Sequence, residues 1–253
     1  MPRLSVCIEM IFRPMEHFPD RIAATKEAGY DAFEFWSWLN KDMNAILEAK
    51  EKAGIDCAAF GVGGGTLIDP SNHQKYADTL SQAAEWAKQL RCQCVIVTTG
   101  NTLPDVPHEK QRDDLRRGLE GVAKAAQAGG VTAVLEPLNS KVNHKGYFLD
   151  HVPDGIRLVE EINNPHLKLL YDMYHGQIMD GDIIATLEGS IDKIGHFHVA
   201  DVPGRHEPGT GELNYANIFK RIDDSGYKGF VGLEYHPSAD HAASLAQVKA
   251  LCA

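Results

Sequence analysis

The stretch Ile194-Gly195-His196-Phe197-His198-Val199-Ala200-Asp201 decides how the rest of the chain is interpreted. It predicts a buried strand that ends in polar residues. Because residues two apart share one face of a strand, His196 and His198 point the same way, and His198 lies nearer the carboxyl end. The loop that follows, residues 202–212, holds Arg205 among glycines and prolines, which let the backbone approach a ligand closely. This stretch therefore predicts a histidine and an arginine at one site.

Short runs of strand-forming residues alternate with longer amphipathic stretches along the whole chain. Strands are predicted at Leu4–Glu9, Asp31–Trp36, Ile55–Phe60, Cys94–Thr99, Thr132–Glu136, Leu167–Asp172, Lys193–Val199 and Gly229–Glu234. Helices are predicted between them at Glu16–Ala28, Asp42–Ala53, Pro70–Leu90, His108–Gln127, His151–Ile162, Gln177–Leu187 and Tyr215–Asp223, with a last one near Ala239–Leu251. Eight strand–helix pairs over about 250 residues favour an α/β fold of one domain, residues 1–253: a single (β/α)8 TIM barrel rather than an open doubly wound sheet.

The two ends of the predicted barrel differ in composition. Glycines shortly before the next strand predict left-handed helix ends and short connections at one face; they are Gly29, Gly54, Gly129 and Gly226. The longer loops lie at the opposite face, at Gly61–Asp69, Gly100–Pro107, Pro137–Leu149 and Asp201–Asn214. Barrel enzymes keep their chemistry at the carboxyl ends of the strands, so we expect the functional site among these longer loops.

Charge and hydropathy argue against several classes of protein. The formal net charge is −10 and the chain has no dense basic run, which argues against nucleic acid as a partner and favours a small polar ligand or a metal ion. No segment reaches the roughly 18 consecutive apolar residues of a membrane span, and Met1 leads almost directly into a strand, so a cytoplasmic protein is expected. The five cysteines are odd in number and are predicted to be reduced, structural thiols.

Four neighbouring strands end in side chains that bind divalent cations. Glu136 ends the fifth strand, Asp172 the sixth, His198 the seventh and Glu234 the eighth. Neighbouring strands lie about 5 Å apart, so these four ends can converge on one ion above the barrel axis. Three carboxylates and one imidazole favour Mg²⁺, Mn²⁺ or Co²⁺. The alternative is that each acid caps the following helix or pairs with a nearby cation.

Three runs are long enough to be compared with known families: Leu135–Asn139, Tyr171–Asp182 and Pro203–Tyr215, to which Gly229–Tyr235 adds. They resemble the hydroxypyruvate isomerase family, which belongs to the xylose isomerase-like TIM barrels. The resemblance implies a divalent metal ion held by Glu136, Asp172, His198 and Glu234, with the two glutamates also acting as acid and base. It further implies substrate contacts from His175 and Arg205, and conversion of hydroxypyruvate to tartronate semialdehyde or isomerisation of a related sugar acid.

Two features depart from that family's pattern. Members of the isomerase branch often carry glutamine at the seventh-strand metal position, whereas His198 matches the related ketose 3-epimerases. Those epimerases place a further glutamate shortly after the fifth-strand one, but here no glutamate occurs in residues 137–143. A metal-dependent ketose 3-epimerase is therefore the enzymatic alternative. A non-catalytic sugar-binding barrel is another, and so is an endonuclease, which would need a basic groove and more than one histidine ligand.

The expected chemistry assigns roles to two further polar residues, His175 and Arg205. Moving a proton between adjacent carbons passes through an enediolate, whose charge a metal ion can stabilise while two glutamates transfer the proton. His175 would polarise a substrate oxygen, unless it faces solvent at the start of a helix. Arg205 would hold a substrate carboxylate at two points, unless it pairs with Glu207 or Glu212.

Other features carry weaker predictions. Residues Gly61–Gly65 resemble a phosphate cradle but lack the lysine of a P-loop, so a strand-to-helix loop beside the substrate is favoured. Trp36 and Trp38 would form an aromatic wall over the site, make a subunit contact in a homo-oligomer, or pack within their loop. Glu34 alternates with Trp36, so it is predicted to face the barrel interior and to support the site or contact substrate.

Overall fold

The computed structural model describes residues 2–252 and confirms the predicted barrel. Its strands are β1 (Arg3–Cys7), β2 (Ala32–Phe35), β3 (Asp56–Gly61), β4 (Cys94–Val97), β5 (Thr132–Leu135), β6 (Leu167–Asp172), β7 (Ile194–Val199) and β8 (Phe230–Leu233). Each strand pairs in parallel with the next, and β8 pairs with β1. The sheet is therefore closed, and its strand ends form two rings.

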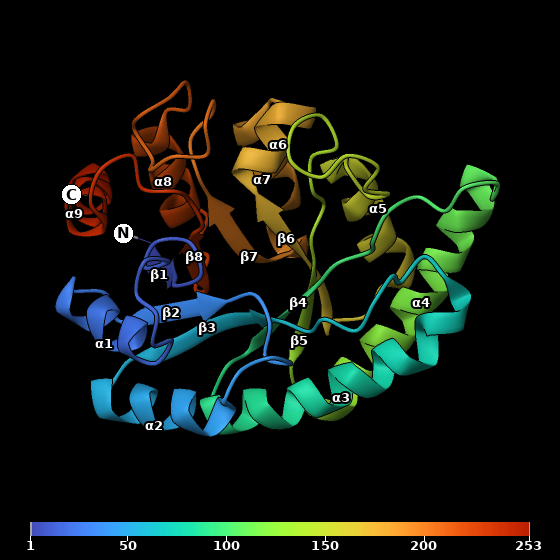
Figure 1. The fold of residues 1–253 in the computed structure, drawn as a ribbon. Coiled ribbons are helices and arrows are strands. Elements are labelled where there is room, and N and C mark those ends of the chain that lie inside the picture. Colours follow the sequence, from blue (N-terminus) through green and yellow to red (C-terminus); the bar gives the residue numbers. More distant parts are fainter. Residues whose placement is uncertain (1, 253) are drawn as a thin grey trace.

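Helices surround the strands on the outside of the barrel (Figure 1). They are α1 (Asp20–Glu27), α2 (Met43–Ala53), α3 (His73–Leu90), α4 (His108–Gly129), α5 (Val152–Ile162), α6 (Met173–Met179), α7 (Ile183–Ser190), α8 (Tyr215–Asp224) and α9 (His241–Cys252), with 3₁₀ turns at Pro70–Asn72 and Ile191–Lys193. The last helix packs beside the first part of the chain, since the Tyr30 hydroxyl donates to the Leu245 carbonyl at 2.8 Å.

Alternation along the strands explains why polar side chains gather inside the barrel. A small apolar layer is formed by Ala59, Ile96, Val134 and Leu170. Residues two apart share a face of a strand, so Glu136 follows Val134, and Asp172 follows Leu170, on the interior side. The register places Asp172 beside His198, and His198 beside Gly232, on three adjacent strands. The interior face thus changes from apolar to polar toward the carboxyl ends.

Some predicted boundaries are wrong. The helix predicted at Gln177–Leu187 is two helices, α6 and α7, because Gly181 and Asp182 have left-handed backbone φ angles of 69° and 48°. The left-handed residue that ends α4 is Gly130, with φ of 69°, whereas Gly129 is still helical. These differences lie outside the barrel strands and leave the strand count unchanged.

Within residues 2–252, no helix combines the length and apolar character needed to cross a membrane. All five cysteines are free, and Cys7, Cys57 and Cys92 are buried. Burial raises the pKa of the Cys94 thiol to about 12, so this group stays protonated near neutral pH, as expected for a structural thiol.

Candidate active site

Four side chains from separate strand ends meet at the carboxyl end of the barrel. Glu136 follows β5, Asp172 ends β6, His198 lies in β7 and Glu234 follows β8. All four are buried, and one nitrogen or oxygen atom from each lies within 4.8 Å of the others. The structure therefore brings together the residues that the strand pattern predicts. They are called the four-residue cluster below.

His198 directs one ring nitrogen at two of the carboxylates. Its Nδ1 lies 3.3 Å from Glu136 Oε1 and 3.4 Å from Glu234 Oε2, and it is buried without a hydrogen-bond partner among residues 2–252. Oxygen or nitrogen atoms about 2.1 Å from one ion in octahedral geometry lie about 3 Å apart. The spacing and the unpartnered nitrogen therefore fit a site that can hold a divalent cation.

The two glutamates of the cluster differ in their ionisation. Burial raises the pKa of Glu136 to about 7; His198 opposes this effect, while Glu234 and Asp172 add to it. Burial also acts on Glu234, but the positive charges of Arg205 and His198 outweigh it and lower the pKa of that carboxyl. A cation bound among these carboxylates would relieve their mutual repulsion.

Asp172 has a structural contact as well as a place in the cluster. Its Oδ1 accepts hydrogen bonds from the backbone nitrogens of Tyr174 at 2.8 Å and His175 at 3.2 Å, which caps α6. Its Oδ2 lies 3.7 Å from Nη2 of Arg205. The helix cap considered as an alternative role is present, and it orients the other oxygen of the same carboxylate toward the site.

His175 is buried beside the cluster, so the alternative in which it faces solvent is wrong. Its Nδ1 accepts a hydrogen bond from the backbone nitrogen of Asn139 at 3.1 Å, so a neutral ring carries its proton on Nε2. That Nε2 lies 3.5 Å from Asp172 Oδ2 and has no hydrogen-bond partner among the described residues. Burial lowers the pKa of His175 to about 4, so the ring is neutral at pH 7.

Arg205 contacts the cluster instead of the acids in its own loop. Its guanidinium pairs with Glu234 and lies near Asp172. Glu207 instead accepts hydrogen bonds from Ser238, and Glu212 accepts one from Gln177. The alternative pairing considered for Arg205 is therefore wrong, and its positive charge lies inside the site.

A cavity of about 310 Å³ opens onto the cluster. Its lining residues come from several strand ends and loops: Trp36, Gly61, Gly63, Ile96, Thr98, Glu136, Leu138, His144, His198, Arg205 and Glu234. His144 and the His175 partner Asn139 were not predicted as functional residues. Both lie in the long loop Pro137–Leu149, and Asn139 also ends the run Leu135–Asn139 that resembles the isomerase family.

The two tryptophans after β2 have different contacts. Nε1 of Trp36 donates to Glu234 Oε1 at 2.6 Å. Nε1 of Trp38 donates instead to the Val62 carbonyl after β3, at 3.0 Å, and the Trp38 side chain packs against the hydrophobic core. A Cβ atom at Gly61 would lie 1.9 Å from the Trp36 carbonyl oxygen. The first glycine of the glycine-rich loop is thus needed for close approach of two backbone segments, which favours a strand-to-helix loop over a phosphate cradle.

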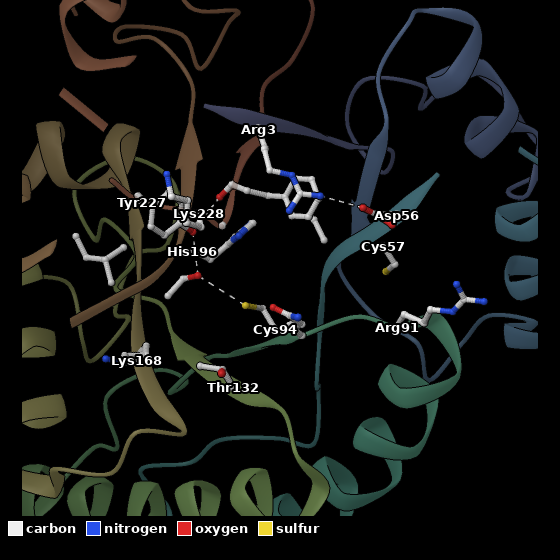
Figure 2. Close-up of a pocket in the computed structure, with 16 residues that line it drawn as sticks. Arg3, Asp56, Cys57, Arg91, Cys94, Thr132, Lys168, His196, Tyr227 and Lys228 are labelled. Carbon is white, nitrogen blue, oxygen red and sulfur yellow. Dashed lines mark hydrogen bonds and ion pairs between the residues drawn. The ribbon is translucent and has the colours of Figure 1, made fainter. Parts of the chain in front are cut away.

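A larger cavity, of about 480 Å³, lies at the amino-terminal mouth of the barrel (Figure 2). Arg3 crosses this mouth to pair with Asp56 at 3.0 Å, and Tyr227 donates to the Gly195 carbonyl at 3.0 Å. The four-residue cluster lies at the other end of the strands. Size alone therefore does not identify the functional cavity of this barrel.

In its amino-acid sequence, the chain is similar to proteins that are named as isomerases. A family model described as "Xylose isomerase-like TIM barrel" matches residues 22–251. A protein named "2-oxo-tetronate isomerase" from Cupriavidus necator is 34% identical, with 98% of each chain covered. A protein named "Hydroxypyruvate isomerase" from Escherichia coli K12 is 32% identical, with 97% of each chain covered.

Solved structures show the same architecture. A crystal structure described as "AP endonuclease, family 2" from Brucella melitensis superposes with a TM-score of 0.93 at 28% identity and covers 99% of both chains. An L-ribulose 3-epimerase superposes with a TM-score of 0.82 at 21% identity, covering 99% of this chain and 93% of the other. At that identity the second likeness establishes only a shared fold.

Proposed function

The chain belongs to the xylose isomerase-like TIM barrel family, and from its named relatives we infer that it is an isomerase of small sugar acids. Two of its relatives are named for hydroxypyruvate and for 2-oxo-tetronate. Both compounds have a carboxylate, a carbonyl on the second carbon and a hydroxyl on the third. The proposed substrate is a short acid of this 2-oxo-3-hydroxy class. One observation carries the proposal: the positive Arg205 lines a single cavity together with Glu136, His198 and Glu234 of the cluster, and it pairs with Glu234.

The proposed reaction moves one proton between neighbouring carbons. A carboxylate removes the proton from the third carbon to form an enediolate, and a carboxylic acid returns a proton to the second carbon. The hydroxyl proton passes from the oxygen on the third carbon to the oxygen on the second. Glu136 and Glu234 are the proposed acid and base because they flank His198 from β5 and β8, and both line the cavity.

The remaining groups would stabilise and orient the substrate. A divalent cation held by the cluster, proposed to be Mg²⁺, Mn²⁺ or Co²⁺, supplies the positive charge that an enediolate requires. His175, neutral and with its proton on Nε2, is suited to donate a hydrogen bond to a substrate oxygen. Arg205 can hold the substrate carboxylate with two parallel hydrogen bonds. A three- or four-carbon acid held there would have its reacting carbons close to both glutamates.

Two other activities are less well supported. A ketose 3-epimerase is compatible with His198, but Arg205 would then have no carboxylate to bind on a neutral sugar. Cleavage of nucleic acid is disfavoured because the four-residue cluster contains one histidine and the chain has a net charge of −10.

Turnover in D₂O, followed by NMR, distinguishes these activities. With hydroxypyruvate, the isomerase should yield tartronate semialdehyde that carries deuterium on the carbon that was the carbonyl. With a ketose, an epimerase would instead return a sugar deuterated at its third carbon. Product formation is followed at the same time, because direct proton transfer without solvent exchange would give product with little label. Binding of either compound without product or label would support a non-catalytic barrel and overturn the proposal.

A further inference from the structure

Glu34 in β2 places its carboxylate between two histidines of β7. Its Oε2 lies 2.9 Å from His196 Nε2 and accepts a hydrogen bond from Ser5 Oγ at 2.8 Å. Its Oε1 lies 3.0 Å from His198 Nε2, within ion-pair distance, and neither of these two buried atoms has a hydrogen-bond partner among the described residues. Glu34 and both histidines are no more than 2% exposed. Glu34 does not belong to the four-residue cluster. It contacts the ring nitrogen of His198 that faces away from Glu136 and Glu234.

The barrel leaves a dedicated space for this carboxylate. A Cβ atom at Gly232 would lie 2.2 Å from Glu34 Oε1 and 2.5 Å from Oε2. Gly232 is the register partner of His198 in β8, so the missing side chain opens the interior beside that histidine. His196, on the opposite side of Glu34, lines the cavity at the amino-terminal mouth (Figure 2). The Glu34 carboxylate is thus enclosed by groups from β1, β7 and β8.

In a neutral His198 ring, only one of the two nitrogens can carry the proton. A neutral imidazole carries one proton, and only the nitrogen without it can bind a metal ion. Nδ1 faces the cluster, but a proton there would also be attracted by Glu136 and Glu234, whose oxygens lie 3.3 Å and 3.4 Å away. The cluster alone therefore does not ensure that Nδ1 is the nitrogen without the proton.

We propose that Glu34 is a positioning residue, which holds the His198 proton on Nε2 and leaves Nδ1 free to bind a divalent cation. This inference rests on the proposed function, because it assumes that the four-residue cluster holds a cation. In this proposal, the Glu34 carboxylate is kept in place beside the His198 ring by Ser5, His196 and Gly232. A carboxylate that accepts from the far nitrogen of a histidine ligand typically changes metal affinity by about 10- to 100-fold.

Proton positions can be measured directly. In protein labelled with ¹⁵N-histidine and loaded with Mg²⁺, long-range ¹H–¹⁵N spectra report which ring nitrogen of His198 is protonated. The wild-type protein should show a proton on Nε2 and none on Nδ1. A proton on Nδ1 in the wild-type protein would overturn the inference without any variant.

The matched variants separate a proton acceptor from a space-filling side chain. Glu34→Leu keeps an apolar volume but offers no acceptor, so Mn²⁺ affinity, read from the EPR signal of free Mn²⁺, should fall by at least about 10-fold. Glu34→Gln should recover part of that loss, because its amide oxygen can accept from Nε2. Ser5→Ala removes one bond to Glu34 but leaves the contact with His198, so its effect should be smaller than that of Glu34→Leu.

Folding is monitored by circular dichroism, and Gly232→Ala provides a second way to displace the carboxylate if Glu34→Leu does not fold. Wild-type affinity in a folded Glu34→Leu variant, or in a folded Gly232→Ala variant, would overturn the inference. If the wild-type protein binds neither Mg²⁺ nor Mn²⁺, the proposed metal site fails. The role of Glu34 is then decided by spectra of the metal-free protein at increasing pH. If His198 loses its Nδ1 proton first, Glu34 holds the remaining proton on Nε2 as proposed. If His198 loses its Nε2 proton first, the inference is overturned.

Discussion

Trp36 and Glu234 are joined by a 2.6 Å hydrogen bond from the indole nitrogen to Oε1, which links the loop after β2 to the end of β8. Trp36 is 49% exposed, so this bond forms part of the cavity mouth. Glu234 is thereby held at one oxygen by Trp36 and at the other by Arg205. Each contact stabilises the ionised form of the carboxyl.

Replacing Trp36 by phenylalanine should therefore reduce activity. A hydrogen bond to a charged group contributes about 1.5 kcal/mol at the lower end of its range, which corresponds to about a 10-fold loss in kcat/KM. Trp38→Phe is the control, because Trp38 bonds to a backbone carbonyl away from Glu234. Equal losses in the two variants would attribute the effect to loop packing.

Removal of metal should abolish activity, and Mg²⁺, Mn²⁺ or Co²⁺ should restore it, because the cluster offers three carboxylates and one imidazole. Binding at 100 times the dissociation constant should also raise the free energy of unfolding by about 2.7 kcal/mol. Activity and thermal unfolding are measured after exhaustive dialysis with metal analysis. Full activity in protein shown to be metal-free would contradict the proposal.

Glu136→Gln and Glu234→Gln should each lower the rate of deuterium incorporation by at least about 100-fold, since an amide cannot take up or release the proton. Metal content is measured in parallel, because both residues also belong to the cluster. Glu212→Gln, at an exposed position of the Arg205 loop, is the matched control. A variant that keeps its metal and exchanges label at the wild-type rate would remove that glutamate from the mechanism.

Arg205→Lys should raise KM for 2-oxo-3-hydroxy acids more than for neutral hydroxy-ketones of the same length. Lysine retains the charge but cannot form two parallel hydrogen bonds to a carboxylate. Steady-state kinetics with both classes of compound measure the difference. The same change in KM for both would assign Arg205 to the support of Glu234 and Asp172 rather than to substrate.

The buried, neutral His175 should make stability depend on pH. Its pKa is lowered to about 4 in the folded protein, below the unfolded value of about 6.5. Between these values the unfolded chain binds the extra proton, so stability is complete above pH ~6.5 and falls as pH decreases toward 4.

His175→Asn removes this titration while keeping an acceptor for the Asn139 amide. In that window the slope of the unfolding free energy against pH should decrease by up to about 1.4 kcal/mol per pH unit. Denaturant unfolding at several pH values measures it. Identical slopes for the variant and the wild-type protein would show that His175 does not lose a proton on folding.

The sequence alone determined the barrel and the membership of its four-residue cluster. Strand periodicity is local, so the positions of Glu136 and Asp172, each two residues beyond an interior apolar residue, follow from the chain itself. The closed barrel then requires neighbouring strand ends to meet. His198 and Glu234 are interior for the same reason. The break between α6 and α7 was missed because it depends on the left-handed backbone at Gly181 and Asp182 inside an otherwise helical pattern.

Only the tertiary structure decided how the side chains are partnered. Arg205 had acids available in its own loop, and its choice of Glu234 depends on how that loop folds over the barrel. His175, in α6, accepts a hydrogen bond from Asn139 in the loop after β5, and Trp36 reaches Glu234 from the loop after β2, which is distant in the sequence. Such contacts depend on loop conformations and on desolvation inside the closed barrel, for which the local sequence has no periodic signal.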